Sequence, residues 1–111
     1  MIKMDEKTAV NKIRAGRFIK NNGKVLRTIN IMRYKFEKLS EVHYALDDMP
    51  ENEYFDSLNY LFEAGYIQIR HIRSRQPAVL ADEDIEQLEA KLTDKGIRLL
   101  AGRMFDELVE V

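Results

Sequence analysis

Three arginines and a histidine crowd into the segment 70–75, "RHIRSR", in an otherwise acidic half of the chain. Arginine binds phosphate oxygens through paired hydrogen bonds, and it also enters narrow minor grooves of DNA. The cluster of Arg70, Arg73 and Arg75 therefore predicts contact with a nucleic-acid backbone. The acidic residues of the nearby run 82–86, "DEDIE", support an equal alternative, in which the same arginines form ion pairs within the protein.

A second basic region lies toward the N-terminus. Its members are Lys12, Arg14, Arg17, Lys20, Lys24 and Arg27. Residues 1–38 contain eleven Lys/Arg and three Asp/Glu, a net charge of +8, whereas residues 39–111 contain seven and sixteen, a net charge of −9. This asymmetry predicts either a nucleic-acid partner for the basic region or attraction between the two halves, within one chain or across a dimer.

The segment 51–64, "ENEYFDSLNYLFEA", has the apolar spacing of a helix and contains four acids but no Lys or Arg. On a DNA-reading helix, Asn52, Ser57 and Tyr60 are the side chains that we expect to reach the bases. Acids close to phosphates reduce affinity for DNA. Glu51 and Glu53 therefore have a second interpretation, in which they stabilise the positive end of the helix dipole.

The chain offers few of the side chains that catalysis or metal binding requires. It contains no Cys, and its two histidines, His43 and His71, lie on different predicted elements. No Gly-rich phosphate loop or nucleophile motif is present. We therefore expect a non-enzymatic protein without metal or cofactor. No apolar run reaches the roughly 20 residues that span a bilayer, so we expect no membrane partner and a cytoplasmic location.

The periodicity of apolar residues predicts helices over 5–20, 24–35, 40–48, 51–64 and 94–109, with a turn at the "NNG" of 21–23. Ser40 and Thr93 are suitable N-caps, and Gly65 is a suitable helix stop. Alternation of apolar and polar residues predicts strands over 66–70 and 87–92, joined in an antiparallel hairpin. In the competing interpretation, "DEDIEQLEAKL" of 82–92 forms a helix.

The last predicted helix has apolar residues on two sides, which is more than one neighbouring element can cover. We expect a homodimer whose interface contains Leu99, Phe105 and Val109, together with Phe18 and Ile19 of the first helix. In the alternative, the first helix covers the second apolar stripe within one chain.

The order of these elements predicts a single, mainly α domain with a small antiparallel β hairpin. Residues 24–93 form the helix-turn-helix core and wing, residues 1–23 an extra basic N-terminal helix and residues 94–111 a C-terminal helix. "SLNYLFEAGYIQI" followed by "LEAKLTDKGIRLLAGR" resembles winged helix-turn-helix proteins, with "LTDKG" similar to multiple-antibiotic-resistance and PadR-type regulators. "AKLTDKGIRLLAGR" also resembles small winged-helix proteins of Mu-like phages and prophages, from which this chain departs in its basic first helix and longer wing.

The resemblance implies a DNA-binding transcriptional regulator of bacterial or prophage origin. The charge of segment 51–64 supports the alternative, a winged-helix adaptor that binds another protein instead of DNA.

Overall fold

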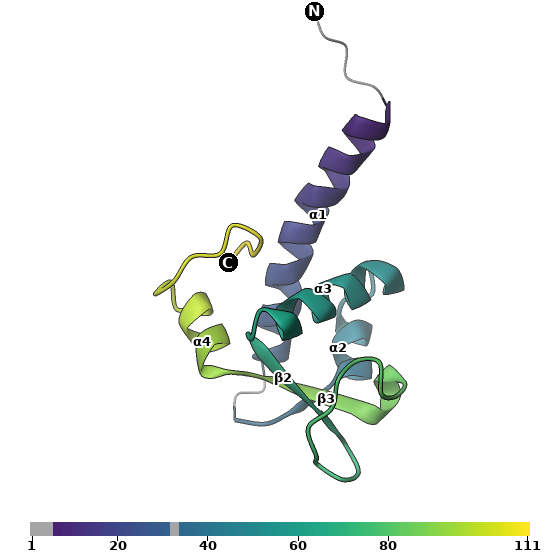
Figure 1. Cartoon of the computed structure of the whole chain (residues 1–111), viewed down its shortest axis with the longest axis vertical. Helices are drawn as coiled ribbons and strands as arrows, with labels where there is room; N and C mark the ends of the chain where they lie inside the picture. Colours follow the sequence, from purple (N-terminus) through teal and green to yellow (C-terminus); the bar gives the residue numbers. More distant parts are fainter. Residues whose placement is uncertain (1–5, 32–33) are drawn as a thin grey trace, which may run out of the picture.

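The computed structural model describes residues 6–31 and 34–111, and it is mainly helical with a small antiparallel sheet. The helices are α1 (Glu6–Ile29), α2 (Leu39–Ala45), α3 (Glu51–Glu63) and α4 (Asp94–Leu100), and a short 3₁₀ helix spans Ile85–Gln87. The strands are β1 (Glu37–Lys38), β2 (Ile67–His71) and β3 (Leu88–Leu92). Figure 1 shows α1 leaving the body of the molecule at one end, while the loop between β2 and β3 leaves it at the other.

The sheet has the order β1-β3-β2, and both pairs of neighbours are antiparallel. In the hairpin, Ile67 lies opposite Leu92 and Ile69 opposite Ala90, so the alternating apolar side chains meet on one face. This register confirms the strand interpretation of residues 88–92 over the helical one. The sequence analysis missed β1, because two residues are too few to produce a periodic signal.

The core lies between α1, α2, α3 and the buried face of the sheet. Its fully covered apolar side chains come from these four parts and from α4. They are Val25, Leu26, Ile29, Leu39, Tyr54, Leu58, Leu61, Leu88, Ala90 and Leu99. The stripe of α3 is set by Tyr54, Leu58 and Leu61, at the spacing that places side chains on one face of a helix.

The predicted break at 21–23 is wrong, because α1 continues through it as one helix of 24 residues. Burial outweighs the weak helix propensity of Asn and Gly here. Asn22 is fully buried and donates its side-chain amide to the carbonyl of Leu108 at 2.9 Å. The carbonyl oxygen of Glu110 lies so close to Gly23 that an added Cβ would overlap it.

The remaining helix boundaries were predicted with mixed success. α1 ends at Ile29, not at residue 35, and Met32 of the predicted helix lies outside the described residues. Ser40 is not an N-cap, because α2 begins at Leu39 with Lys38 at its cap. Thr93 does cap α4, since its hydroxyl accepts from the Gly96 amide.

Glycine terminates two of the helices. Gly65 has φ +84° and ends α3, as predicted. Gly102 has φ +74° and ends α4 near Leu100, which makes the predicted helix over 94–109 wrong in its second half. The Gly102 amide donates to Leu99 and the Arg103 amide to Arg98, the pattern of a Schellman motif. The chain then continues as an irregular segment, residues 101–111, which we call the strap.

Candidate nucleic-acid interface

The loop between β2 and β3 begins with a tight reversal that exposes two arginines. The His71 amide donates to Gln76 and the Arg75 amide donates to His71, each at 2.9 Å, and Arg70 bridges to Pro77. Residues 72–76, which we call the loop tip, project beyond this closure. Arg73 and Arg75 are exposed there, and Arg75 has a positive φ of 62°. The reversal therefore presents both guanidinium groups to solvent.

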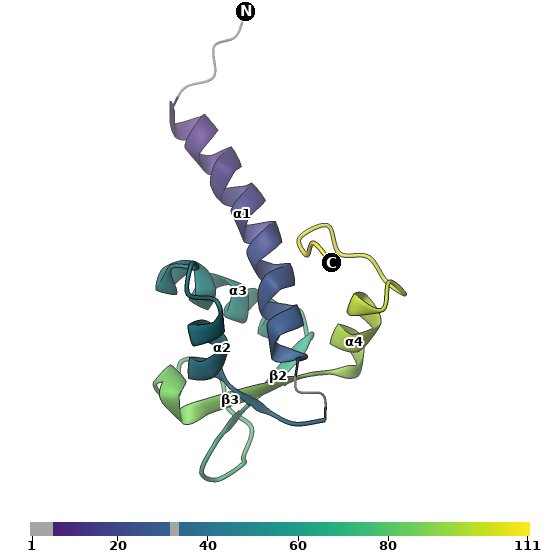
Figure 2. The ribbon, with the colours of Figure 1, turned by 180° about the vertical axis from the view of Figure 1, so that it is seen from behind.

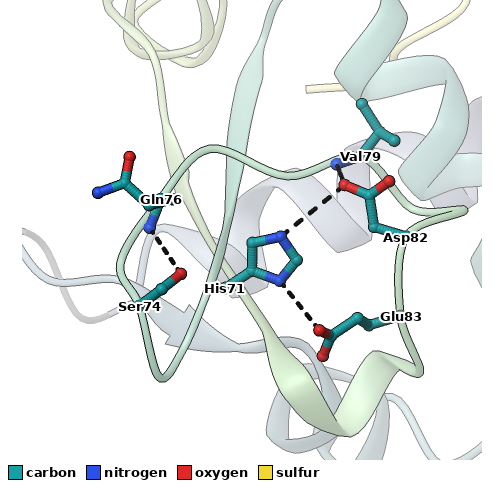
Figure 3. A network of polar contacts seen from close by, with 6 residues as sticks. All are labelled: His71, Ser74, Gln76, Val79, Asp82 and Glu83. Atoms are coloured by element: carbon teal, nitrogen blue, oxygen red, sulfur yellow. Dashed lines mark hydrogen bonds and ion pairs between the residues drawn. The ribbon is translucent and has the colours of Figure 1, made fainter.

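The acids of the same loop gather around His71 instead of around these arginines. Figure 3 shows the imidazole between Asp82 and Glu83, at 3.8 Å and 3.6 Å from their carboxylates. Asp82 also accepts from the Val79 amide at 3.1 Å, which fixes its position in the loop. In the described part of the chain, no ion pair involves Arg73 or Arg75. Both guanidinium groups of the loop tip are thus exposed and unpaired within the described residues.

Arg70, the third predicted arginine, is engaged within the sheet. Its guanidinium pairs with the buried Glu89 at 2.5 Å and lies over the Phe36 ring at 3.6 Å from the centroid. Arg70 and Glu89 are cross-strand partners in the hairpin. This pairing explains why Glu89 is buried although its position in the alternation predicts exposure. Of the three arginines, only Arg70 forms the expected internal ion pair in the described residues. Its partner is Glu89 and not one of the acids of residues 82–86.

On α3 the structure separates the three predicted base-contacting residues. Asn52 is exposed. Ser57 is fully buried, so its predicted role in base contact is wrong. It follows Tyr54 by three residues and precedes Leu61 by four, a spacing that could have placed it on the buried face. Tyr60 is partly covered and donates its hydroxyl to Asp106 at 2.6 Å.

The exposed face of α3 is polar and acidic. Sequence reasoning missed Asn59, which follows Asn52 by two helical turns and is exposed as well. Asp56 and Glu63 share this face and are also exposed. Amide side chains that can read adenine thus alternate with carboxylates that repel phosphates.

The basic residues of α1 meet the acids of α3 at one point. Arg17 pairs with Glu53 at 3.1 Å, and Asn21 donates to the same carboxylate at 3.1 Å. A shallow groove of about 240 Å³ lies beside this contact, lined by Arg14, Arg17, Phe18, Asn21, Asn52, Glu53 and Asp56. At this contact, opposite charges of the two halves of the sequence meet within one chain. Lys12, Arg14, Lys20 and Lys24 remain exposed.

The two basic regions do not form one surface. The first half of α1 and the loop tip lie at opposite ends of the molecule in both views (Figures 1 and 2). The longest dimension of the protein is 58 Å, compared with 32 and 22 Å for the others. A nucleic-acid segment held by the loop tip therefore lies far from Lys12 and Arg14.

Asp106 forms a polar cluster that the sequence analysis did not foresee. Its Oδ2 accepts from the hydroxyls of Tyr60 and Tyr66, at 2.6 and 2.5 Å, and its Oδ1 accepts from the Leu108 amide. Asp106 follows Tyr60 by 46 residues and Tyr66 by 40 residues in the sequence. No local spacing could therefore have predicted the cluster. It fastens the strap to α3, through Tyr60, and to Tyr66, the residue before β2.

The cluster shifts the pKa values of its members in opposite directions. Burial acts to raise the pKa of the Asp106 carboxyl, but the hydrogen bonds from Tyr60, Tyr66 and Leu108 outweigh it and hold that pKa below its usual value. Burial, followed by the hydrogen bond to Asp106, raises the pKa of Tyr60 to about 12. The same causes raise the pKa of Tyr66 well above its usual range.

The predicted dimer residues are divided between core and surface. Leu99 is 0% and Val109 5% exposed, so the chain itself covers them and they leave no surface for a second copy. Phe105 is 87% exposed. Phe18 packs edge-on against Tyr60 at 5.6 Å, and Ile19 accepts from the Glu110 amide through its carbonyl. The described chain therefore buries Leu99 and Val109 within itself.

Across residues 6–31 and 34–111, no group of three or more His, Asp or Glu side chains is placed to hold a metal ion. His43 instead stacks on Tyr54, with 4.6 Å between ring centroids. None of the helices described is both long and apolar enough to cross a membrane.

Comparison with known proteins finds no matching protein-family model, no matching curated protein and no matching solved structure.

Proposed function

We propose that the chain is a non-enzymatic winged-helix protein that binds DNA as a transcriptional regulator. Its elements follow the order expected of a winged helix, with α2 and α3 as the helix-turn-helix pair and the β2–β3 hairpin as the wing. The observation that carries the proposal is the loop tip, where Arg73 and Arg75 are exposed and have no acid paired with them in the described part of the chain.

The distribution of charge indicates how DNA is held. Arginines at the end of a wing reach phosphates or a narrow minor groove. Asn52 and Asn59 can add contacts to base edges, but Asp56 and Glu63 on the same face oppose close approach of the backbone. We therefore expect the wing to supply most of the affinity and α3 to supply modest sequence preference.

The test is fluorescence anisotropy with a random duplex at low salt, comparing the wild type with the double variant Arg73→Ala/Arg75→Ala. Losing two phosphate contacts should weaken binding by roughly tenfold or more and reduce the salt slope by about two. The matched control is Arg98→Ala/Arg103→Ala, which removes two exposed arginines from α4 and the strap. Absence of binding to any duplex at low ionic strength, or equal losses in both double variants, contradicts the proposal.

A second function is favoured by the acidic face of α3. Asp56 and Glu63 are exposed there, and the helix has no Lys or Arg. Such a surface suits a basic segment of another protein, as in a winged-helix adaptor. A Lys/Arg-rich helical peptide serves as the probe in an NMR titration. Shifts confined to α3 that disappear in Asp56→Asn/Glu63→Gln, in a protein that fails the duplex test, would favour the adaptor.

A further inference from the structure

The side chain of His71 lies between two carboxylates of its own loop, and this arrangement favours one charge state of the ring. Its Nε2 is 3.8 Å from Oδ2 of Asp82, and its Nδ1 is 3.6 Å from Oε1 of Glu83 (Figure 3). A neutral imidazole has one N–H and one nitrogen with a free electron pair, so only one of the two carboxylates can then face a donor. The imidazolium has an N–H on both nitrogens. The geometry therefore fits the protonated ring.

The contact joins the two sides of the loop between β2 and β3. His71 is the last residue of β2, and its backbone closes the loop tip through hydrogen bonds with Arg75 and Gln76. Asp82 lies on the other side of the loop. Its carboxylate accepts from the Val79 amide and its own amide donates to the Val79 carbonyl, each at 3.1 Å. An imidazolium at position 71 thus ties this turn to the base of the loop tip.

The other charged groups of the hairpin are engaged elsewhere or exposed. Arg70, on the neighbouring position of β2, pairs with Glu89. The residue opposite His71 in the sheet is the apolar Leu88. The exposed charged side chains of the loop are Arg73, Arg75, Asp84 and Glu86. In the described part of the chain, the acids that pair with His71 are therefore Asp82 and Glu83.

We propose that His71 is a pH switch that sets the affinity of the loop tip for DNA. Below neutral pH the imidazolium holds Asp82 and Glu83 and offsets one of their two negative charges. When the ring loses its proton, both carboxylates keep their full charge in the loop that presents Arg73 and Arg75. At low salt, charges act on one another over distances on the order of 30 Å, so these acids then oppose the approach of phosphates.

Affinity for DNA should therefore rise as pH falls. Imidazole is the side chain whose charge ordinarily changes between about pH 5 and 8, whereas Lys or Arg at this position would keep its charge throughout that range. The His71 side chain is 23% exposed and the two acids about twice as much, so protons of the solvent reach all three groups. His43 differs, because it stacks on Tyr54 and its Nε2 faces the Met49 carbonyl.

The effect on DNA affinity rests on the proposed function, whereas the coupling between His71 and its loop does not. One experiment is therefore directed at each.

The first experiment measures fluorescence anisotropy of a random duplex at low salt, at pH values of about 7.5 and 5.5. The wild type should bind roughly threefold or more tighter at the lower pH. His71→Gln, which stays neutral, should change by less than about twofold and resemble the wild type at the higher pH. His71→Lys, which stays charged, should bind at both values about as tightly as the wild type does at the lower one.

The matched control is His43→Gln, which removes the other histidine of the chain and should keep the wild-type pH dependence. Circular dichroism checks that each variant is folded. A wild-type rise that persists in His71→Gln overturns the proposal. So does a His71→Lys variant that binds no tighter than His71→Gln at the higher pH.

The second experiment follows the backbone amide signals of Val79, Asp82 and Glu83 by NMR over the same pH range, without DNA. These signals should move together with the ring signals of His71 in the wild type and stay in place in His71→Gln. Asp84→Asn/Glu86→Gln, which changes two exposed acids of the same loop, is the matched control and should keep the movement. Loop amides that do not follow the ring, or that move equally in His71→Gln, overturn the proposal.

The outcomes separate the switch from the proposed function. Binding of duplex that responds to neither His71 variant overturns the switch and leaves the proposed function standing. Absence of binding to any duplex at either pH overturns the proposed function and, with it, the control of DNA affinity by His71, even where the loop amides still follow the ring.

Discussion

The two halves of α1 look alike in sequence but have opposite surroundings. Each half contains a glycine between polar or small residues and several basic side chains. In the first half, residues 6–17, which we call the arm, a Cβ added at Gly16 would meet no atom of the described residues within 4 Å. The second half buries Gly23, Val25 and Leu26 at the centre of the molecule. The comparison teaches that the elements packed against a helix, more than its local sequence, decide which of its residues are buried.

The strap supplies part of the difference. It returns from α4 and lies along the second half of α1, where Asn22 donates to Leu108 and Arg27 donates to Glu110, each at 2.9 Å. The Glu110 amide in turn donates to Ile19. Asp106 holds the start of this segment against Tyr60 and Tyr66. α3 covers the same half of α1 from another side, through the contacts of Asn21 with Glu53 and of Phe18 with Tyr60.

The largest effect should come from Gly23→Ala. The new Cβ would overlap the Glu110 carbonyl oxygen, so the end of the strap must move away from α1. Overpacking of a filled site typically costs 1–3 kcal/mol, and the better helix propensity of Ala offsets less than about 1 kcal/mol of it. We expect a loss of about 2 kcal/mol in the free energy of unfolding, measured by urea denaturation. An unchanged midpoint would show that the strap does not press on α1 in solution.

A smaller loss is expected from Asp106→Asn, which removes the charged acceptor of two tyrosine hydroxyls. Hydrogen bonds to charged groups contribute about 1.5–3 kcal/mol, and the amide oxygen retains part of this. We expect a loss of about 1–2 kcal/mol and faster proteolysis of the strap. Asp94→Asn is the matched control, since its exposed i,i+4 pair with Arg98 is worth less than about 0.5 kcal/mol. Equal losses in the free energy of unfolding of the two variants would show that Asp106 does not hold the strap in place.

Elements whose signal is local could be predicted from the sequence. The stripe of α3, the glycine stop at Gly65 and the alternation of β2 and β3 each depend on residues within about ten positions, and the structure confirms them. The exposed arginines of the loop tip follow from the same hairpin. For this reason the fold class and part of the candidate interface were accessible without coordinates.

The features that depend on distant contacts could not be predicted. Asn22 stays in a helix because Leu108, 86 residues away, accepts its hydrogen bond. Arg70 is removed from the candidate interface by Glu89 and Phe36, which lie on two other segments. Ser57 is the exception, since its spacing from Tyr54 and Leu61 already indicated the buried face.

Alkaline pH tests the contacts beside the second half of α1, because Tyr60 packs against Phe18 and donates its hydroxyl to Asp106 of the strap. The pKa of Tyr60 is raised to about 12, so the neutral tyrosine stabilises the fold fully below about pH 10 and progressively less as pH rises toward 12. Tyr60→Phe should cost about 1 kcal/mol at neutral pH and lose less stability between pH 10 and 12 than the wild type. Parallel pH profiles from urea denaturation would contradict this. Tyr44→Phe, at an 86% exposed position, is the control.

The smallest effect, and one of opposite sign, should come from Gly16→Ala. Among residues 6–31 and 34–111, no atom lies near the added Cβ, and Ala is favoured over Gly in a helix by about 1 kcal/mol. At protein concentrations low enough to keep the chain monomeric, helicity measured by circular dichroism should rise, while the free energy of unfolding changes by less than about 1 kcal/mol because the arm frays before the core unfolds. Gly23→Ala and Gly16→Ala, the same substitution in one helix, should therefore shift stability in opposite directions. Equal losses of stability in the two variants would contradict this difference between the halves of α1.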